Sequence, residues 1–205
     1  MLRKKPKIND QDSVIVDACK QGDVDAFEIL VRKYQKRMFN ITYRIVGNYE
    51  DACEVLQDAF VSAYKNIRRF KGKAKFSTWL LAIVINHSKN RLKKLRSRFL
   101  NEPFSIDDPI PTDPTGTEVA EVEAVSNEPS SLDQLERKTI QEHVQKCIDT
   151  ISEGFKEVLV LRDMHGFAYL EISEILNIPE GTVKSKLFRA RDILKNCLKK
   201  VLGDL

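Results

Sequence analysis

The sequence has few of the residues that form metal sites or disulfide frameworks. It contains four cysteines and three histidines in 205 residues, and no two cysteines are spaced as a CxxC pair. We therefore expect no metal ion, no other cofactor and no disulfide scaffold, with thiols that are buried and reduced. We interpret Cys53 as a small core residue, and a redox sensor is the less favoured alternative. The other cysteines are Cys19, Cys147 and Cys197.

Long apolar runs are also missing. No stretch approaches the roughly 18 to 20 apolar residues of a transmembrane helix, and the basic start of the chain lacks the apolar core of a signal peptide. We expect a soluble, cytoplasmic protein that does not insert into a membrane. The carboxylates Glu171, Glu174 and Glu180 have no cluster of His, Cys or Asp residues around them in the sequence. We therefore expect that the protein is not an enzyme.

Acidic residues are absent from one stretch, residues 65–98, which holds twelve Lys or Arg residues. The same stretch contains Phe70, Phe76 and the only tryptophan, Trp79, and Tyr64 directly precedes it. Cations can neutralise phosphates and aromatic rings can stack on bases, so this composition favours a nucleic-acid-binding surface. The alternative is a solvated helix face with Trp79 in the core, and we expect Trp79 to pack partly inward.

Basic residues, in turn, are absent from residues 101–131, which hold eight acids and five of the seven prolines. A segment of this composition cannot bury enough apolar surface to offset the entropy lost on ordering. We interpret it as an acidic, Pro-rich flexible linker. The net charge of +4 therefore conceals two basic parts on either side of an acidic segment.

Apolar residues recur at intervals of three and four on both sides of this linker, which predicts an all-α fold. Before the linker we expect helices at residues 14–20, from Asp23 to about Val46, at 50–67 and at 77–98, with Asp23 and Ser77 as N-caps and Gly47-Asn48 as a helix end. The predicted organisation is a polar tail at residues 1–11, an N-terminal helical bundle at 12–100, the linker at 101–131 and a C-terminal helix-turn-helix domain at 132–205.

Residues 166–191 carry the pattern of a helix-turn-helix. A short apolar helix is followed by Asn177, which tolerates the left-handed conformation of a tight turn, and by Pro179 at the entry of a basic helix. A recognition helix presents its N-terminal half to base edges in the major groove. The alternative is an ordinary helical hairpin with a basic outer face. The residues predicted to face outward are Lys184, Ser185, Phe188, Arg189 and Arg191.

At this point the chain resembles the extracytoplasmic-function group of bacterial RNA polymerase sigma factors. Residues 181–191 resemble that family's −35 recognition helix, and residues 76–80 with Asn86 and Asn90 resemble its −10 reader. Residues 51–60 resemble the helix that docks on the polymerase clamp. The three motifs occur in the family's order and span nearly the whole chain.

The resemblance implies a division of roles. Residues expected to contact the −35 element are Lys184, Ser185, Lys186, Phe188, Arg189 and Arg191. Residues expected at the −10 element are Phe70, Lys73, Lys75, Phe76, Trp79, Asn86, Lys89 and Asn90, and Asn86 with loop 70–75 would capture a flipped base. Residues expected to bind the polymerase are Glu54, Gln57 and Asp58.

The resemblance also implies partners. They are core RNA polymerase, through its clamp coiled coil and flap, promoter DNA and a cognate anti-sigma factor. The function implied is promoter recognition and strand opening by a subunit without catalysis of its own. The alternative is a stand-alone helix-turn-helix regulator, whose N-terminal half would be a sensing or dimerising domain.

Overall fold

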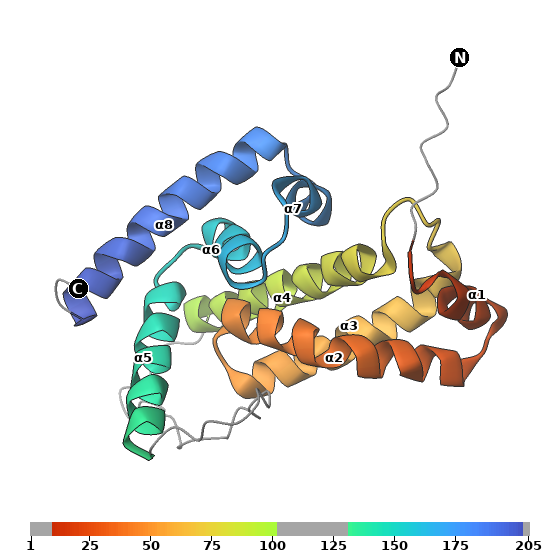
Figure 1. Cartoon of the computed structure of the whole chain (residues 1–205), viewed down its shortest axis with the longest axis horizontal. Coiled ribbons are helices and arrows are strands. Elements are labelled where there is room, and N and C mark those ends of the chain that lie inside the picture. Colours follow the sequence, from red (N-terminus) through yellow and green to blue (C-terminus); the bar gives the residue numbers. More distant parts are fainter. Residues whose placement is uncertain (1–9, 102–130, 203–205) are drawn as a thin grey trace.

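The computed structural model describes residues 10–101 and 131–202, and these residues are entirely helical apart from turns and short connections (Figure 1). The all-α prediction is therefore confirmed, whereas the predicted tail up to residue 9 and the linker at 102–130 lie outside the described residues. The helices are α1 Ser13–Gln21, α2 Val24–Val46, α3 Tyr49–Asn66, η1 Ile67–Arg69, α4 Phe76–Asn101, α5 Ser131–Asp149, α6 Glu153–Leu159, η2 Val160–Met164, α7 Tyr169–Leu176 and α8 Glu180–Leu202.

Local signals set the ends of α2 and α3. The Asp23 carboxylate accepts a hydrogen bond from the Ala26 amide at 3.0 Å, and the Asn48 side chain accepts one from the Asp51 amide at 2.9 Å. Each bond satisfies an amide that the first turn of a helix leaves without a partner. Gly47 ends α2 in the left-handed conformation, with φ of 86°. The predicted cap at Asp23 and the predicted break at Gly47 are therefore confirmed.

The start of α4 differs from the prediction. Ser77 is not its N-cap, because the helix already begins at Phe76. The Phe76 amide donates to the Asp10 carboxylate at 2.6 Å, so the acceptor comes from a residue 66 positions earlier. Nearby, the buried Asp12 carboxylate accepts from the Tyr34 hydroxyl and from Lys33 Nζ. The segment before α1 thus fastens the middle of α2 and the beginning of α4 together.

The N-terminal core lies between α2, α3 and α4, and α1 covers one end of it (Figure 1). Each large apolar side chain that is buried in this core contributes about 1.5–3 kcal/mol, so the buried residues of α4 are a principal source of stability. The largest side chains without exposed surface in this core include Leu30, Met38, Ile41, Phe76, Leu80 and Leu81.

The C-terminal half is built from α5 to α8 around a second set of buried residues. Its central side chains are Ile148, Val158, Leu159, Leu161, Ile172, Val183 and Leu187. Asn177 adopts the left-handed conformation with φ of 51° between α7 and α8, as predicted. The Ser173 hydroxyl donates to the Ile178 carbonyl at 2.6 Å and holds the turn closed. This geometry joins α7 and α8 as a helix-turn-helix.

Two expectations about cysteine are wrong. Cys147 of α5 and Cys197 of α8 form a disulfide, whereas both were expected as reduced thiols. Cys53 is exposed on α3 and is not a core residue. Cys19 is buried, as expected. Among the described helices, none is both long and apolar enough to span a membrane, and no group of His, Cys, Asp or Glu could hold a metal ion.

Candidate nucleic-acid interface

The first half of α8 has one buried face and one exposed face. Val183, Leu187 and Ala190 are at most 2% exposed and fix the helix against the core of the C-terminal half. Phe188, by contrast, is 76% exposed, and Arg189 beside it is also exposed. Packing within the folded chain does not explain why the Phe188 ring is exposed. Such a ring next to a guanidinium can contact a thymine methyl and a guanine edge when the helix lies in the major groove.

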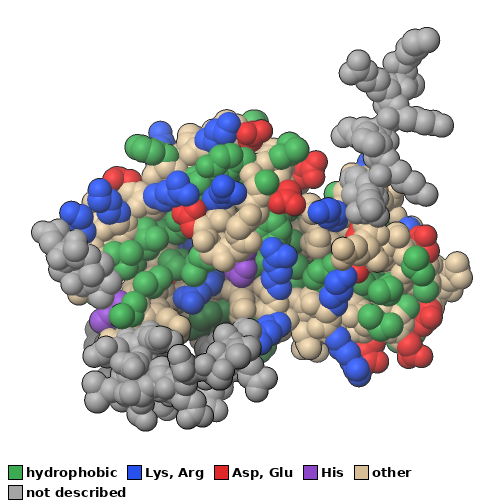
Figure 2. Space-filling model, viewed as in Figure 1, with side chains coloured by type: hydrophobic (Ala, Val, Ile, Leu, Met, Phe, Trp, Pro, Cys, Tyr) green, Lys and Arg blue, Asp and Glu red, His purple; other side chains and the backbone are tan. Residues whose placement is uncertain are grey.

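The remaining residues predicted for this helix differ in their surroundings. Lys184 and Ser185 are exposed on the outer face, with Lys184 Nζ 3.0 Å from Glu180 Oε1. Arg191 forms a bidentate pair with Asp163, at 2.8 and 2.6 Å, and these hydrogen bonds raise the pKa of Arg191. Arg191 therefore ties α8 to η2 in this structure. Figure 2 shows Lys and Arg side chains along the upper part of the molecule, where Figure 1 places α8.

Lys186 turns away from the exposed face. Its side chain is half-buried, and a Cβ placed on Gly154 of α6 would lie 3.0 Å from Lys186 Nζ. The absence of a side chain at Gly154 therefore makes room for the lysine. The predicted −35 residues thus divide into an outer group and an inward-facing lysine.

On α4, the predicted aromatic residues do not form an open stacking surface. Phe76 is fully buried and Phe70 is 8% exposed, so neither ring can be reached by a base in this conformation. They were expected to contact DNA, and in this structure they support Trp79, whose ring centroid lies 5.1 Å from Phe70 and 5.6 Å from Phe76. Trp79 is half-buried, as expected. Burial of the two phenyl rings follows from apolar packing, which a composition of mixed rings and cations does not reveal.

The polar residues predicted on α4 and before it are accessible. Lys73 and Lys75 are exposed in the turn between η1 and α4, and the turn passes through Gly72 with φ of 64°. Asn86 and Asn90 are exposed and lie four residues apart, so they share one face of the helix. This face can offer amide groups to a base and ammonium groups to phosphates.

Lys89 lies between these asparagines but faces the other half of the molecule. Its Nζ is 3.1 Å from Glu157 Oε2, and Glu157 of α6 is only 3% exposed. Burial raises the pKa of Glu157, while the positive charges of Lys89 and Lys186 act in the opposite direction. Lys89 therefore contacts a buried carboxylate that is also influenced by the charge of Lys186, which was predicted for the other DNA element. In this arrangement neither lysine is directed outward at a phosphate.

Other contacts also join the two halves. The Arg37 guanidinium lies 4.5 Å from the Phe167 ring centroid and donates to the His165 carbonyl at 3.4 Å. Arg44 donates to Gln145 at 2.8 Å. Burial, together with the positive charges of Arg37 and Arg44, lowers the pKa of His165 to about 4. The interface is therefore polar as well as apolar.

The predicted polymerase-binding residues lie on α3. Glu54, Gln57 and Asp58 are all exposed. Arg91 of α4 pairs with Asp51 and lies 2.9 Å from Glu54, which fixes α3 against α4. An open groove runs between the two helices, and its lining includes Glu54, Asp58, Asn90, Arg91, Lys93 and Lys94.

Some residues of this site gave no signal in the sequence. Glu157 is one acid among many until the fold places it opposite Lys89, 68 positions away in the chain. Asp10 was predicted in the polar tail and Asp12 stood at the very start of the predicted bundle, yet they hold the start of α4 and the side chain of Tyr34. The one available hint for Glu157 was its place inside the apolar run of residues 155–161.

Comparisons with known proteins agree with the geometry. The Sigma-70 region 2 family matches residues 30–98, and the Sigma-70 region 4 family matches residues 141–194. An ECF RNA polymerase sigma-E factor from Haemophilus influenzae is 35% identical over 185 residues, which cover 90% of this chain and 94% of the relative.

Solved structures share the arrangement of helices. The structure of CnrH in complex with the cytosolic domain of CnrY has a TM-score of 0.63 at 19% identity, and covers 93% of this chain and 99% of that one. The sigma factor RpoE in complex with the anti-sigma factor NepR from Bartonella quintana has a TM-score of 0.62 at 19% identity, and covers 86% and 98%. At this identity the similarity concerns the fold.

Proposed function

The chain belongs to the ECF RNA polymerase sigma factors, which initiate transcription at promoters and are not enzymes, and from this premise we propose that α8 reads the −35 element and α4 the −10 element. Membership of this family replaces the alternative of a stand-alone regulator. The division into a region 2-like domain at residues 12–100, an acidic linker at 101–131 and a region 4-like domain at 132–205 is part of the proposal.

The −35 element is read by the outer face of α8. Ser185, Phe188 and Arg189 contact base edges, and Lys184 contacts phosphate. The observation that carries this assignment is the contrast along one helix between buried Val183, Leu187 and Ala190 and the 76% exposed Phe188. Arg191 reaches phosphate once its pair with Asp163 is exchanged for DNA, and Lys186 once it leaves the electrostatic influence of Glu157.

The −10 element is read by the exposed face of α4 together with the preceding turn. Asn86 and Asn90 offer amide groups to an extruded base of the non-template strand, and Lys73 and Lys75 hold its phosphates. Trp79 offers the accessible edge of its ring, which Phe70 and Phe76 support from below. Lys89 joins this surface when it leaves Glu157.

Core polymerase binds the outer face of α3 through Glu54, Gln57 and Asp58. Their exposure on a helix fixed by the Arg91 pairs supports this role, because the surface is rigid and acidic. The clamp coiled coil and the flap are the proposed contact sites on polymerase. The protein acts in the cytoplasm.

A cognate anti-sigma factor is a further proposed partner. RpoE of Bartonella quintana, which shares the fold, was solved with the anti-sigma factor NepR. We expect the inhibitor of this chain to cover the DNA-binding faces of α4 and α8.

The function is tested with purified chain and core polymerase. The chain alone is expected to bind promoter DNA weakly, because Lys89 and Lys186 face Glu157 and each half offers a small surface. Addition of core polymerase is expected to give transcripts with a defined start. Strong operator binding by the chain alone, with no effect of polymerase, would contradict the proposal.

A further inference from the structure

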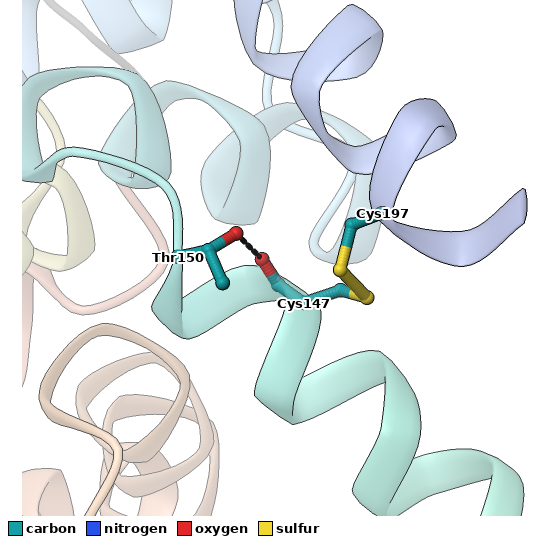
Figure 3. The surroundings of a disulfide bond; sticks show 3 residues. All are labelled: Cys147, Thr150 and Cys197. Carbon is teal, nitrogen blue, oxygen red and sulfur yellow. Dashed lines mark hydrogen bonds between the residues drawn. A yellow bond between two sulfur atoms is a disulfide. The ribbon is translucent and has the colours of Figure 1, made fainter. Parts of the chain in front are cut away.

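The disulfide between Cys147 and Cys197 links two helices that are far apart in the chain. Cys147 lies on α5 and Cys197 near the end of α8, 50 positions apart in the chain and with Cα atoms 5.6 Å apart (Figure 3). Cα atoms at this separation can be bridged without movement of the backbone. The other two cysteines, Cys19 and Cys53, lie in the N-terminal half and are unpaired.

The C-terminal half also has an apolar core, apart from this bond. Ile148, Val158, Leu161 and Val183 form a core there with at most 1% exposure each. Domains that need disulfides to fold are those with too small an apolar core. The helices can therefore hold their places in the dithiol form as well as in the disulfide form.

The two sulfur atoms differ in access. Cys147 is fully buried, whereas Cys197 is half-buried on the last turns of α8. A reagent in solution therefore reaches Cys197 first. Cys147 is placed to act as the second thiol, which closes the bond or is released when it opens.

The bond lies where α8 is held least firmly. In the first half of the helix Val183, Leu187 and Ala190 are buried. In the second half Ile193, Leu194 and Leu198 are only partly buried, and Val201 is 45% exposed. The covalent link thus replaces packing that the C-terminal half of α8 lacks.

We propose that Cys147 and Cys197 form a reversible redox site, oxidised by a peroxide and reduced by a dithiol, that fastens the C-terminal half of α8 to α5. The reversibility rests on the function proposed above, because a protein that works on polymerase and DNA meets cellular thiol reductants, and disulfides in such compartments are usually transient.

The chemistry is balanced at each step. Peroxide converts the Cys197 thiol to a sulfenic acid and releases one water. The Cys147 thiol attacks this sulfur, forms the S–S bond and releases a second water. In the reverse direction one thiol of a dithiol attacks the Cys197 sulfur and frees Cys147 as a thiol. The second thiol then attacks the reductant's own sulfur in the mixed disulfide and frees Cys197, so that the dithiol donates two electrons and becomes a disulfide.

The test uses the full chain after treatment with dithiothreitol or with hydrogen peroxide. Thiols are trapped in acid, alkylated in denaturant and counted by mass spectrometry. Peroxide is expected to produce a peptide pair joined through Cys147 and Cys197, and dithiothreitol is expected to restore both thiols in the native chain. The Cys53→Ser variant is the control and keeps this response, whereas Cys197→Ser loses it.

Hydrogen exchange reports the structural consequence. Amides of α8 after Ala190 are expected to exchange at least about tenfold faster in the reduced chain, and those from Glu180 to Ala190 are expected to change less. The oxidised chain is expected to melt on the order of 10 °C higher. Failure of peroxide to join the two cysteines, or equal exchange in both states, would overturn the proposal.

A transcription assay separates this inference from the proposed function. With core polymerase, the oxidised chain is expected to stay active at temperatures where the reduced chain has lost activity. A chain that supports no transcription in either state refutes the proposed function, while the thiol counts and exchange rates still decide the redox site.

Discussion

Lys89 of α4 and Glu157 of α6 form an ion pair with an N–O distance of 3.1 Å across the contact between the two helical halves. The carboxylate is buried, and the positive charge of Lys186 of α8 also acts on it. The same carboxylate therefore attracts one lysine proposed for the −10 element and one proposed for the −35 element. Movement of the two halves apart would free both lysines from this carboxylate.

Replacement of Glu157 by Gln is expected to remove the attraction between this position and the lysines. The amide keeps the shape of the side chain but loses the attraction to Lys89, which is 38% exposed and can turn to solvent. Burial raises the pKa of Glu157, so loss of the charge also removes a desolvation cost, and we expect the free energy of unfolding to change by less than about 1 kcal/mol. Because the lysines are released, we expect a larger radius of gyration in solution scattering and DNA binding that is several-fold tighter for the free chain. Glu28→Gln, which removes an exposed pair with Arg32, serves as the control. An unchanged radius and affinity would show that the pair does not hold the halves together.

Arg189→Ala is expected to weaken discrimination at the −35 element. The guanidinium lies on the exposed face of α8, and loss of a bidentate base contact costs about 1–3 kcal/mol. Transcription with core polymerase should then respond less to base changes in that element, while binding to polymerase is unchanged. Arg32→Ala on α2 is the matched surface control. A uniform loss across all templates would instead indicate a phosphate contact.

The double change Gln57→Ala with Asp58→Ala should weaken binding to core polymerase and leave discrimination at the −35 element unchanged. Both side chains are exposed on α3 and do not belong to the core, so folding should be retained. Affinity for core polymerase, measured by competition with labelled chain, should fall by tenfold or more, which corresponds to about 1.4 kcal/mol. If this variant and Arg189→Ala fail at the same step, the two roles are not separate.

Substitutions at Phe76 and Asn86 test whether the buried ring stabilises the fold and whether the exposed amide acts in promoter opening. Phe76→Ala should destabilise the N-terminal half by about 3–5 kcal/mol, because the ring is fully buried. Asn86→Ala should leave the melting temperature almost unchanged and reduce promoter opening, measured by permanganate reactivity of unpaired thymines. A stable Phe76→Ala variant would show that the ring is not part of the core.

His165 predicts a dependence of stability on pH. Its pKa is lowered to about 4 in the folded chain from 6.5, so the folded state resists protonation. The contribution of neutral His165 is fully present above pH 6.5 and is lost as the pH falls towards 4, because the unfolded chain takes up the proton first. His165→Gln should reduce this decline in a series of denaturant melts. Equal slopes for both proteins between pH 6.5 and 4 would contradict the assignment.

Local signals in the sequence were sufficient for much of the fold. Asp23, Gly47 and Asn177 act on neighbouring amides and carbonyls, so their roles follow from spacing alone. The cap of α4 could not be predicted in this way, because its acceptor is Asp10, from before the first helix.

Residues of the site were predicted less completely than the helices, because several of them depend on contacts between distant parts of the chain. Exposure of Phe188 and Arg189 follows from helical periodicity, and the structure has both on the outer face. Burial of Phe76, pairing of Cys147 with Cys197 and the meeting of Lys89 with Glu157 depend on how helices distant in the chain pack together. Composition and periodicity carry no information about such distances.

The hydrogen bond from the Phe76 amide to Asp10 limits how many N-terminal residues can be removed from the chain. A shortened form that began after Asp12 would lack the acceptor for the Phe76 amide, which is partly buried, and the partner of the buried Tyr34 hydroxyl. Trp79 stands one turn beyond that amide, so such a deletion would disturb the proposed −10 surface without removing any residue proposed to contact DNA. Domain boundaries for expression should therefore be drawn ahead of Asp10.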